Sequence, residues 1–416
     1  MKTLALLVTL TLAVSAQPHP LEALANLARQ GPTAPGLAAA IAKTLSERGG
    51  TAVWGQDYLF VTAAETPVRI SLNNAAPVPM ERIPNSNLWM YFTKMRTGVT
   101  HAYQYYVEGQ PPSPRSDVTG YNPDSYPKPG VPKGKLSNKY VIESKIYAGM
   151  KADYWVYASP GVDPKTPAPL MVWQDGQNLI NGDLTRMRLF TVTENLVHQK
   201  LIPPMVHVLI APGFSPENRP MRSVQYDSMD NRYARFLMEE VLPEVEKSYR
   251  LRSDGYSRAI GGESSGGICS FTAAWHFPDK FARVHSTIGS YTSIQWRPAE
   301  GRDGGNLYPF LVRKEPKRNI RVWLSDGSDD LENTHGSWPL QNIQLANSLK
   351  MKEYDFHFRF AHAAHNSAQA ALDLPESLTW LWRGYDPAKI SEEFLMNPAE
   401  KDKPYYRVTI SNRDAW

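Results

Sequence analysis

The sequence predicts an α/β fold in which helices cover both faces of a mostly parallel β-sheet, preceded by a small β-sandwich. Two observations predict this fold. From about residue 140 onward, apolar strand-like runs such as PLMVW and VHVLI alternate with amphipathic helical segments, the pattern of parallel strands joined by crossover helices. Between residues 51 and 108, short runs of period two are separated by Asn, Pro and Gly, as in a β-sandwich.

The composition is that of a globular protein. The chain has 416 residues, of which 42% are hydrophobic and 21% charged, with a formal net charge of +4. This length is enough for two domains, and the balance is not that of a disordered chain. No long run of Lys and Arg is present, so we do not expect nucleic acid as a partner.

The first residues are typical of a signal peptide. Lys2 precedes an apolar run and the small-residue site Val14-Ser15-Ala16, so residues 1–16 are expected to be removed on export. The run is too short to span a bilayer, and we expect a secreted or periplasmic protein with no membrane span. The single cysteine, Cys269, excludes an internal disulfide. It lies in an apolar helical stretch and is expected to be a buried structural thiol.

The chain divides into five further segments by composition. Residues 17–50 have two short helical patterns interrupted by prolines, and residues 51–108 are the predicted sandwich. Residues 109–139 contain seven prolines and no periodicity, as expected for a connector. Residues 140–385 form the α/β domain, and residues 386–416 are a C-terminal extension without a predicted place.

The most informative segment surrounds Ser264. Gly262-Glu263-Ser264-Ser265-Gly266 matches G-x-S-x-G, with the apolar run RAI before it and an apolar helical stretch after it. In α/β-hydrolases this motif places a nucleophilic serine on a sharp strand-to-helix turn, where small glycines relieve crowding. A glycine-rich turn with an incidental serine is the alternative. The context favours Ser264 as the nucleophile.

Two later loops supply partners for the serine. A serine hydroxyl needs a base, and the base needs an orienting acid. In this fold they follow the serine in the order acid, then His. We predict Asp330, after the strand IRVWLSD, as the acid and His365, after the strand FHFRFA, as the base. Asp326 and Asp329 are rival acids. His362 is a rival base that we expect to be partly buried and to face the loop.

The oxyanion hole requires two backbone donors. One is expected from the N–H of Ser265, directly after the nucleophile, and the other from Gln177 in the loop after PLMVW. Asp175 precedes that loop and is expected to structure it or to bind a substrate hydroxyl. Arg219 and Trp338 are further candidate substrate-binding residues.

Over residues 139–385 the chain resembles the esterase family that includes enterochelin esterase, esterase D and the bacterial feruloyl esterases. The likeness rests on APLMVWQDG, on the block from Asn218 to Tyr249, and on SRAIGGESSGG, SDGSDDLEN and AHAAHNSAQAALDLPESLTWLW. It implies an α/β-hydrolase fold, a triad with Asp330 as its acid, and no metal or other cofactor. The β-rich segment resembles, in position and pattern, the immunoglobulin-type or carbohydrate-module-like domain that enterochelin esterases and some cell-wall esterases carry.

These features predict a secreted serine carboxylic ester hydrolase. The substrate would be a small or polysaccharide-linked ester, with feruloyl or acetyl esters of polysaccharides preferred and a trilactone siderophore as the alternative. Two readings from other classes remain: a carbohydrate-binding protein on an inactive hydrolase scaffold, and an acyltransferase resembling mycolyltransferases. Every proposed catalytic residue lies beyond Tyr140, so the α/β domain is expected to carry the whole chemistry.

Overall fold

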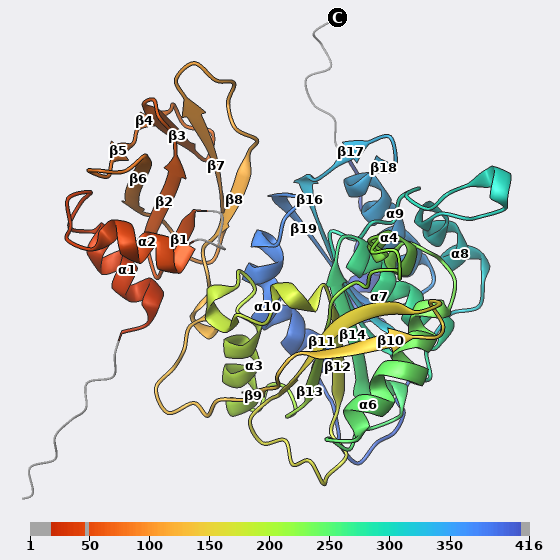
Figure 1. Ribbon diagram of the computed structural model, residues 1–416. Coiled ribbons are helices and arrows are strands. Elements are labelled where there is room, and N and C mark those ends of the chain that lie inside the picture. The colour runs from red at the N-terminus through yellow and green to blue at the C-terminus, as the bar shows by residue number, and fades with distance from the viewer. Residues whose placement is uncertain (1–17, 46–49, 409–416) are drawn as a thin grey trace, which may run out of the picture. The chain divides into compact units, whose positions relative to one another are not determined.

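The computed structural model describes residues 18–45 and 50–408, and the predicted signal peptide lies outside them. The chain divides into two compact units, one up to Val68 together with 79–95 and the other containing 69–78 and everything from Arg96 onward (Figure 1). Within the described ranges, no helix has the length and apolar character needed to cross a membrane.

The first unit packs two helices on an antiparallel sheet. Leu21 and Leu24 on the first helix are buried with Leu59 of the sheet and with Ile83, which follows an edge strand, and this explains the helical apolar spacing of the N-terminal segment. The sheet order is β1-β2-β6-β5. The elements are α1 (Pro20–Ala28), α2 (Leu37–Leu45), β1 (Thr51–Trp54), β2 (Asp57–Ala63), β5 (Glu81–Arg82) and β6 (Leu88–Lys94).

The second unit contains a further four-stranded sheet of order β4-β3-β7-β8. Its strands are β3 (Val68–Leu72), β4 (Val78–Pro79), β7 (Thr100–Val107) and β8 (Ser116–Thr119). The strands expected to form one module over residues 51–108 therefore belong to two sheets. β8 also lies inside the expected connector. Prolines flank this strand but none interrupts it, so its N–H groups can pair with β7 despite the proline-rich composition.

The large sheet of the second unit has the order β10-β11-β13-β12-β14-β15-β16-β19, with β9 paired to β11. The strands from β13 to β19 in this order run parallel to their neighbours, and β9, β10 and β11 pair antiparallel. The sheet is thus mixed but mostly parallel. Its strands are β9 (Lys135–Leu136), β10 (Tyr140–Ser144), β11 (Met150–Ala158), β12 (Leu170–Gln174), β13 (Val206–Ile210), β14 (Arg258–Glu263), β15 (Arg283–Thr287), β16 (Arg321–Asp329) and β19 (Asp355–Ala364).

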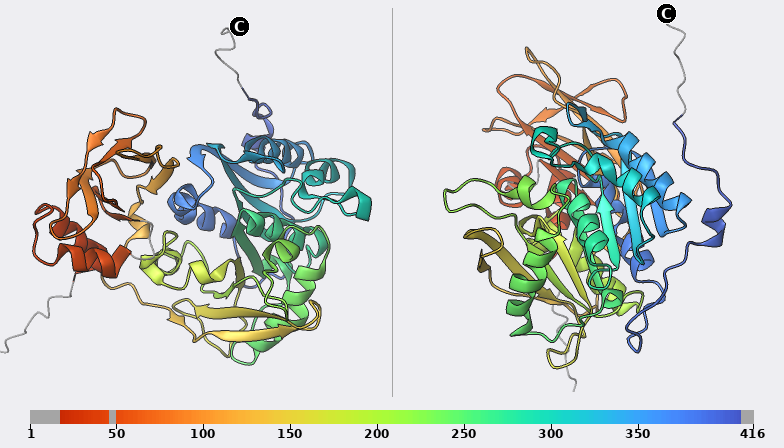
Figure 2. Two further views of the ribbon diagram at one scale, coloured as in Figure 1. Left: turned by 45° about the horizontal axis from the view of Figure 1, so that its top comes forward. Right: turned by 90° about the vertical axis from the view of Figure 1, so that its right-hand side faces the viewer.

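Helices cover this sheet on both faces (Figures 1 and 2). α3 and α10 pack together on one face, and α7, α8 and α9 lie on the other. The helical segment from Arg232 to Glu246 is interrupted by a π-helical turn, Leu237–Val241, because Pro243 offers no N–H to the helical ladder. The helices are α3 (Leu189–His198), α4 (Arg222–Tyr226), α5 (Arg232–Phe236), α6 (Leu242–Glu246), α7 (Ser265–His276), α8 (Tyr308–Lys314), α9 (Trp338–Met351), α10 (Ala368–Trp382) and α11 (Pro398–Lys401).

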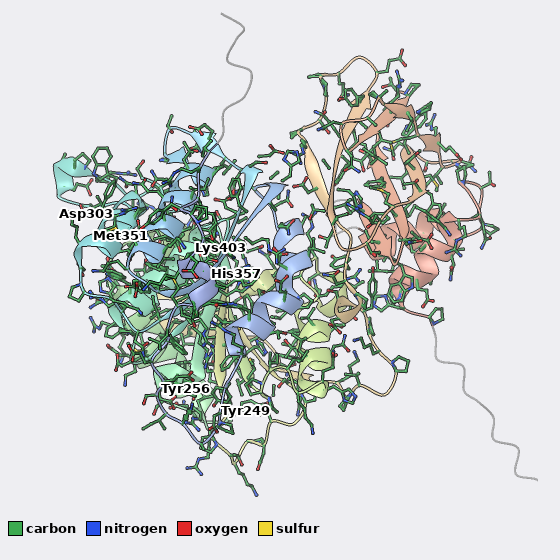
Figure 3. The ribbon with its side chains drawn as sticks, turned by 180° about the vertical axis from the view of Figure 1, so that it is seen from behind. Tyr249, Tyr256, Asp303, Met351, His357 and Lys403 are labelled. Atoms are coloured by element: carbon green, nitrogen blue, oxygen red, sulfur yellow. The ribbon has the colours of Figure 1, made fainter. Side chains whose placement is uncertain are left out.

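The C-terminal extension, unplaced from sequence, packs on the same unit. Phe394 is buried against Tyr256, and Lys350 donates to the carbonyl of Glu400. Figure 3 shows Lys403 close to His357 on the rear of the molecule. The pKa of His357 is lowered, chiefly by burial, with a contribution from Lys403. Residues up to 408 thus belong to the hydrolase-like unit.

Candidate active site

Ser264 lies on the turn between β14 and α7 in a strained backbone conformation, with φ 57° and ψ −122°. A Cβ atom at Gly262 would come within 2.8 Å of the backbone of Gly266, so the turn requires glycine there. The Ser264 N–H donates to the carbonyl of Thr287, and the Ser264 carbonyl accepts from the N–H of Ser290. These bonds fix the strained serine in place.

The structure brings the three predicted triad residues together. Ser264 Oγ lies 2.9 Å from His365 Nε2, and His365 Nδ1 lies 2.5 Å from Asp330 Oδ1. The two partners follow β16 and β19, which are adjacent parallel strands, so their loops emerge at the same edge of the sheet. The Asp330 side chain is fully buried, whereas that of His365 is 21% exposed. A base oriented by a buried acid against a hydroxyl is the arrangement for nucleophilic catalysis.

The rival residues occupy other positions. Asp329 pairs with Arg115 and lies 3.6 Å from His362. The expectation that His362 is partly buried is wrong, because its side chain is 70% exposed. β19 is the edge strand and continues to Ala364. The period-two alternation therefore turns Ala363 inward and His362 outward.

Asp326 is a buried neighbour of Asp330. Its side chain is 2% exposed and Oδ1 accepts the N–H of Gly327. Burial, followed by the adjacent Asp330 carboxylate, raises the pKa of Asp326 well above its usual value. The side chains of Asp330 and Asn342 are hydrogen-bond partners of the Asp326 carboxyl. Two buried carboxyls so placed cannot both ionise cheaply, so Asp326 keeps its proton.

The two predicted oxyanion donors lie in helical segments that follow two neighbouring strands. Ser265 is the first residue of α7, and Gln177 lies in the 3₁₀ turn Gly176–Asn178 after β12, the strand next to β14. Neither the Ser265 N–H nor the Gln177 N–H donates to an acceptor in the described part of the chain. A Cβ atom at Gly176 would lie 2.3 Å from the backbone of Leu209, so glycine is what lets this turn pack on β13.

Arg222, which the sequence analysis did not single out, connects the two sides of this arrangement. Its guanidinium binds both oxygens of Asp175 at 2.8 Å and donates to Ser265 Oγ at 3.1 Å. Asp175 is therefore engaged in structuring the loop that carries Gln177. Arg222 contacts Asp175 and Ser265 in the folded protein, but no motif or spacing in the sequence indicates these contacts.

The two other candidate substrate residues differ in exposure. Trp338 is 3% exposed and donates from Nε1 to Ser290 Oγ, which lies 3.2 Å from Ser264 Oγ. Its ring also packs edge-on against His365. Trp338 thus supports the serine and histidine from below the surface and offers no face to a ligand. Arg219 is exposed in the loop before α4 and stays a candidate.

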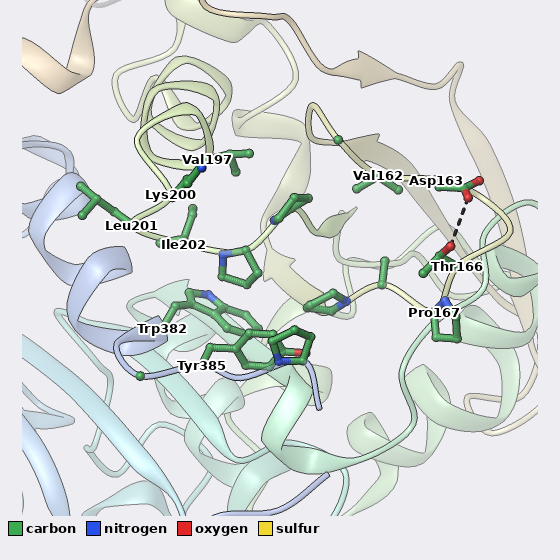
Figure 4. Close-up of a pocket in the computed structure, with 17 residues that line it drawn as sticks. Val162, Asp163, Thr166, Pro167, Val197, Lys200, Leu201, Ile202, Trp382 and Tyr385 are labelled. Carbon is green, nitrogen blue, oxygen red and sulfur yellow. Dashed lines mark hydrogen bonds between the residues drawn. The ribbon is translucent and has the colours of Figure 1, made fainter. Parts of the chain in front are cut away.

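A cavity of about 850 Å³ lies elsewhere in this unit (Figure 4). It is lined by the segments before β12 and β13 and by the end of α10, with Trp382 and Tyr385 facing Ile202. None of its lining residues belongs to the Ser264–His365–Asp330 group. These segments lead into the amino ends of the strands, opposite the loops that carry the three residues.

Known esterases are similar to this chain in sequence. The Esterase family model, described as "Putative esterase", matches residues 148–381. The iron(III) enterobactin esterase of Escherichia coli O6:H1 is 22% identical over 301 residues, covering 61% of this chain and 70% of the relative.

Solved structures give the same fold. An enterobactin esterase from Shigella flexneri superposes with a TM-score of 0.56 at 18% identity, covering 82% of this chain and 98% of its own. A ferric enterobactin esterase from Salmonella typhimurium gives 0.54 at 16% identity, with coverages of 82% and 98%. These similarities show an α/β-hydrolase-like fold with a mixed sheet. Because the family model covers more than half of the chain, this protein belongs to the esterase family and is a carboxylic ester hydrolase.

Proposed function

We propose that the protein hydrolyses esters through an acyl-enzyme formed on Ser264. The observation that supports this most directly is the hydrogen-bonded line from Ser264 Oγ through His365 to the buried Asp330. In the proposed acylation step, His365 Nε2 takes the Ser264 proton as Oγ attacks the ester carbonyl, and it then protonates the leaving alcohol. Asp330 holds the imidazole with Nδ1–H towards it and stabilises the imidazolium.

The tetrahedral intermediates carry a negative oxygen that needs donors. We assign this role to the N–H groups of Ser265 and Gln177, supported by their lack of acceptors among the described residues. The positive end of the α7 dipole adds to the same potential. In deacylation, His365 deprotonates a water that attacks the acyl carbon, and its proton returns to Ser264 as the acid is released.

The ester itself is proposed from two lines of support. Polysaccharide-linked feruloyl or acetyl esters are supported by the β-rich region before residue 140 and by the 11 Trp and 21 Tyr residues. We propose that this β-rich region is of the immunoglobulin type. A trilactone siderophore is supported by the names of the relatives, which are enterobactin esterases. The sequence of residues 1–16 supports export, so either ester would be met outside the cytoplasm.

The test is a substrate panel combined with labelling of the nucleophile. Purified protein is assayed on a feruloyl ester, acetylated xylan and a ferric trilactone siderophore, with and without an alcohol acceptor. Rate dependence on the acceptor, with transfer product formed, would place the protein among acyltransferases. No turnover together with no labelling by a fluorophosphonate would contradict the hydrolase proposal and favour a binding protein.

A further inference from the structure

The histidine loop is held from outside the large sheet, by strand β8. Ala364 and Asn366 flank His365, and both donate to Oδ2 of Asp117, from the Ala364 N–H at 2.8 Å and from the Asn366 side chain at 3.4 Å. One carboxylate oxygen of a strand far away in sequence thus receives hydrogen bonds from both neighbours of the base. A third bond runs from Thr119 Oγ1 to the carbonyl of Ala368, at 2.8 Å.

Asp117 is fully buried. A carboxylate in that setting is costly unless charge-assisted hydrogen bonds compensate. Within the described ranges, the Asp117 carboxylate has three partners: the guanidinium of Arg115 at 3.3 Å and the two neighbours of His365. The position is also fixed from the other side, since Asp117 pairs with Ala102 in the ladder between β8 and β7.

The same strand reaches the acid loop. Arg115, directly before β8, pairs with Asp329, the residue next to Asp330. Arg115 therefore binds both Asp117 and Asp329 and joins the histidine loop to the acid loop. Asp330 and His365 are the residues directly after β16 and β19, whose pairing reaches Asp329 and Ala364.

We propose that Asp117, assisted by Arg115, is a positioning residue that holds His365 in register with Ser264 and Asp330. The proposal rests on the proposed function, because positioning matters for turnover only if these residues form the triad. It also assigns part of the active-site construction to the segment 109–139, which the sequence presented as a connector.

The experiment compares Asp117→Ala and Asp117→Asn with a matched control, Glu194→Ala. Glu194 is likewise a buried carboxylate that accepts a main-chain N–H, that of Gly134 at 3.0 Å, and pairs with a neighbouring cation, Lys133 at 2.8 Å. It does not contact the catalytic loops. Both Ala variants should lose stability, but only Asp117→Ala should lower kcat. We expect a loss of about 10- to 100-fold with KM nearly unchanged, because displacing a catalytic group such as His365 by about 1 Å can lower the rate 10²-fold.

Asp117→Asn should recover most of the kcat, since its amide oxygen can still accept the Ala364 N–H. The downfield NMR resonance of the His365 Nδ1 proton gives a readout independent of turnover. It should weaken or vanish in Asp117→Ala and persist in Glu194→Ala and Asp117→Asn. If Ser264→Ala kept full activity while the resonance behaved as expected, the proposed function would fail and the positioning role would stand.

Arg115→Met is the variant that remains if Asp117→Ala does not fold, because Arg115 is only partly buried. Its lost ion pair should lower kcat about 2- to 5-fold with KM unchanged and weaken the same resonance. Equal kcat and an equal resonance in Asp117→Ala and Glu194→Ala would overturn the proposal. So would an unchanged kcat and resonance in Arg115→Met.

Discussion

Replacing Asp326 by Asn should make the stability of the protein less dependent on pH. Asp326 is 2% exposed and its pKa is raised well above the usual value, first by burial and then by Asp330. As the pH rises above about 4, the unfolded chain releases the proton at this position while the folded protein retains it. The wild type therefore loses free energy of unfolding with rising pH, up to the folded-state pKa. The Asn variant has no proton to lose.

The expected size follows from one retained proton. The slope is about 1.4 kcal/mol per pH unit, so the difference in free energy of unfolding, Asn variant minus wild type, should rise at about that rate over the pH range in which the unfolded chain has released the proton and the folded protein retains it. Other groups with raised pKa values, such as Glu263, are present in both proteins and cancel in the difference.

Asp373→Asn is the matched control. Asp373 is 4% exposed, and burial raises its pKa to about 6. Its difference curve should rise between pH 5 and about 6 and then level off, because its folded-state pKa is about 6. Urea unfolding at pH 5, 6 and 7 measures both. A flat difference for Asp326→Asn would refute the reasoning, because it would mean that Asp326 is ionised in the folded protein.

Three further predictions concern the site. Asp330→Asn should lower kcat about 10⁴-fold, because it favours the wrong histidine tautomer. Asp326→Asn should keep kcat within a few-fold, because its amide still donates to Asp330. Steady-state kinetics would contradict this if the two losses came out reversed. Arg222→Met should lower kcat by about 10- to 100-fold with little change in KM, because Asp175 and Ser265 would no longer be joined by the guanidinium beside the proposed oxyanion donors. An unchanged kcat would show that Arg222 is not needed there. Cys269 is buried, and burial raises the pKa of its thiol well above the usual value. After treatment of the native enzyme with an alkylating reagent, activity should be intact and mass spectrometry should find Cys269 unmodified. Ready alkylation of Cys269 in the native enzyme would contradict this.

The sequence was sufficient to predict the position of residues that directly follow strands of the parallel sheet. Ser264, Asp330 and His365 each follow a strand, and the carboxyl ends of adjacent parallel strands meet at one edge. Their mutual distances therefore follow from topology and chain order. The same rule placed Gln177 after β12, beside Ser265.

The residues that the sequence missed act through contacts that no local pattern encodes. Asp117 lies 247 residues before Ala364, to which it is bonded, in a segment whose prolines indicate a connector. Arg222 meets Asp175 and Ser265 only through the packing of α4. The proposed role of Asp117 and the expectation that the chemistry is contained beyond Tyr140 predict different outcomes for a truncated chain. A chain starting there lacks Asp117 and should lose activity even on a small activated ester.

The central claim is that Ser264 is the nucleophile of a serine esterase. The most direct test is mass-spectrometric mapping of the adduct that a fluorophosphonate forms with the wild-type protein, in parallel with turnover by Ser264→Ala. The account predicts a single adduct on Ser264 and a loss of activity of about 10⁶-fold in a variant that remains folded. An adduct on another residue, or ordinary turnover by Ser264→Ala, would contradict it.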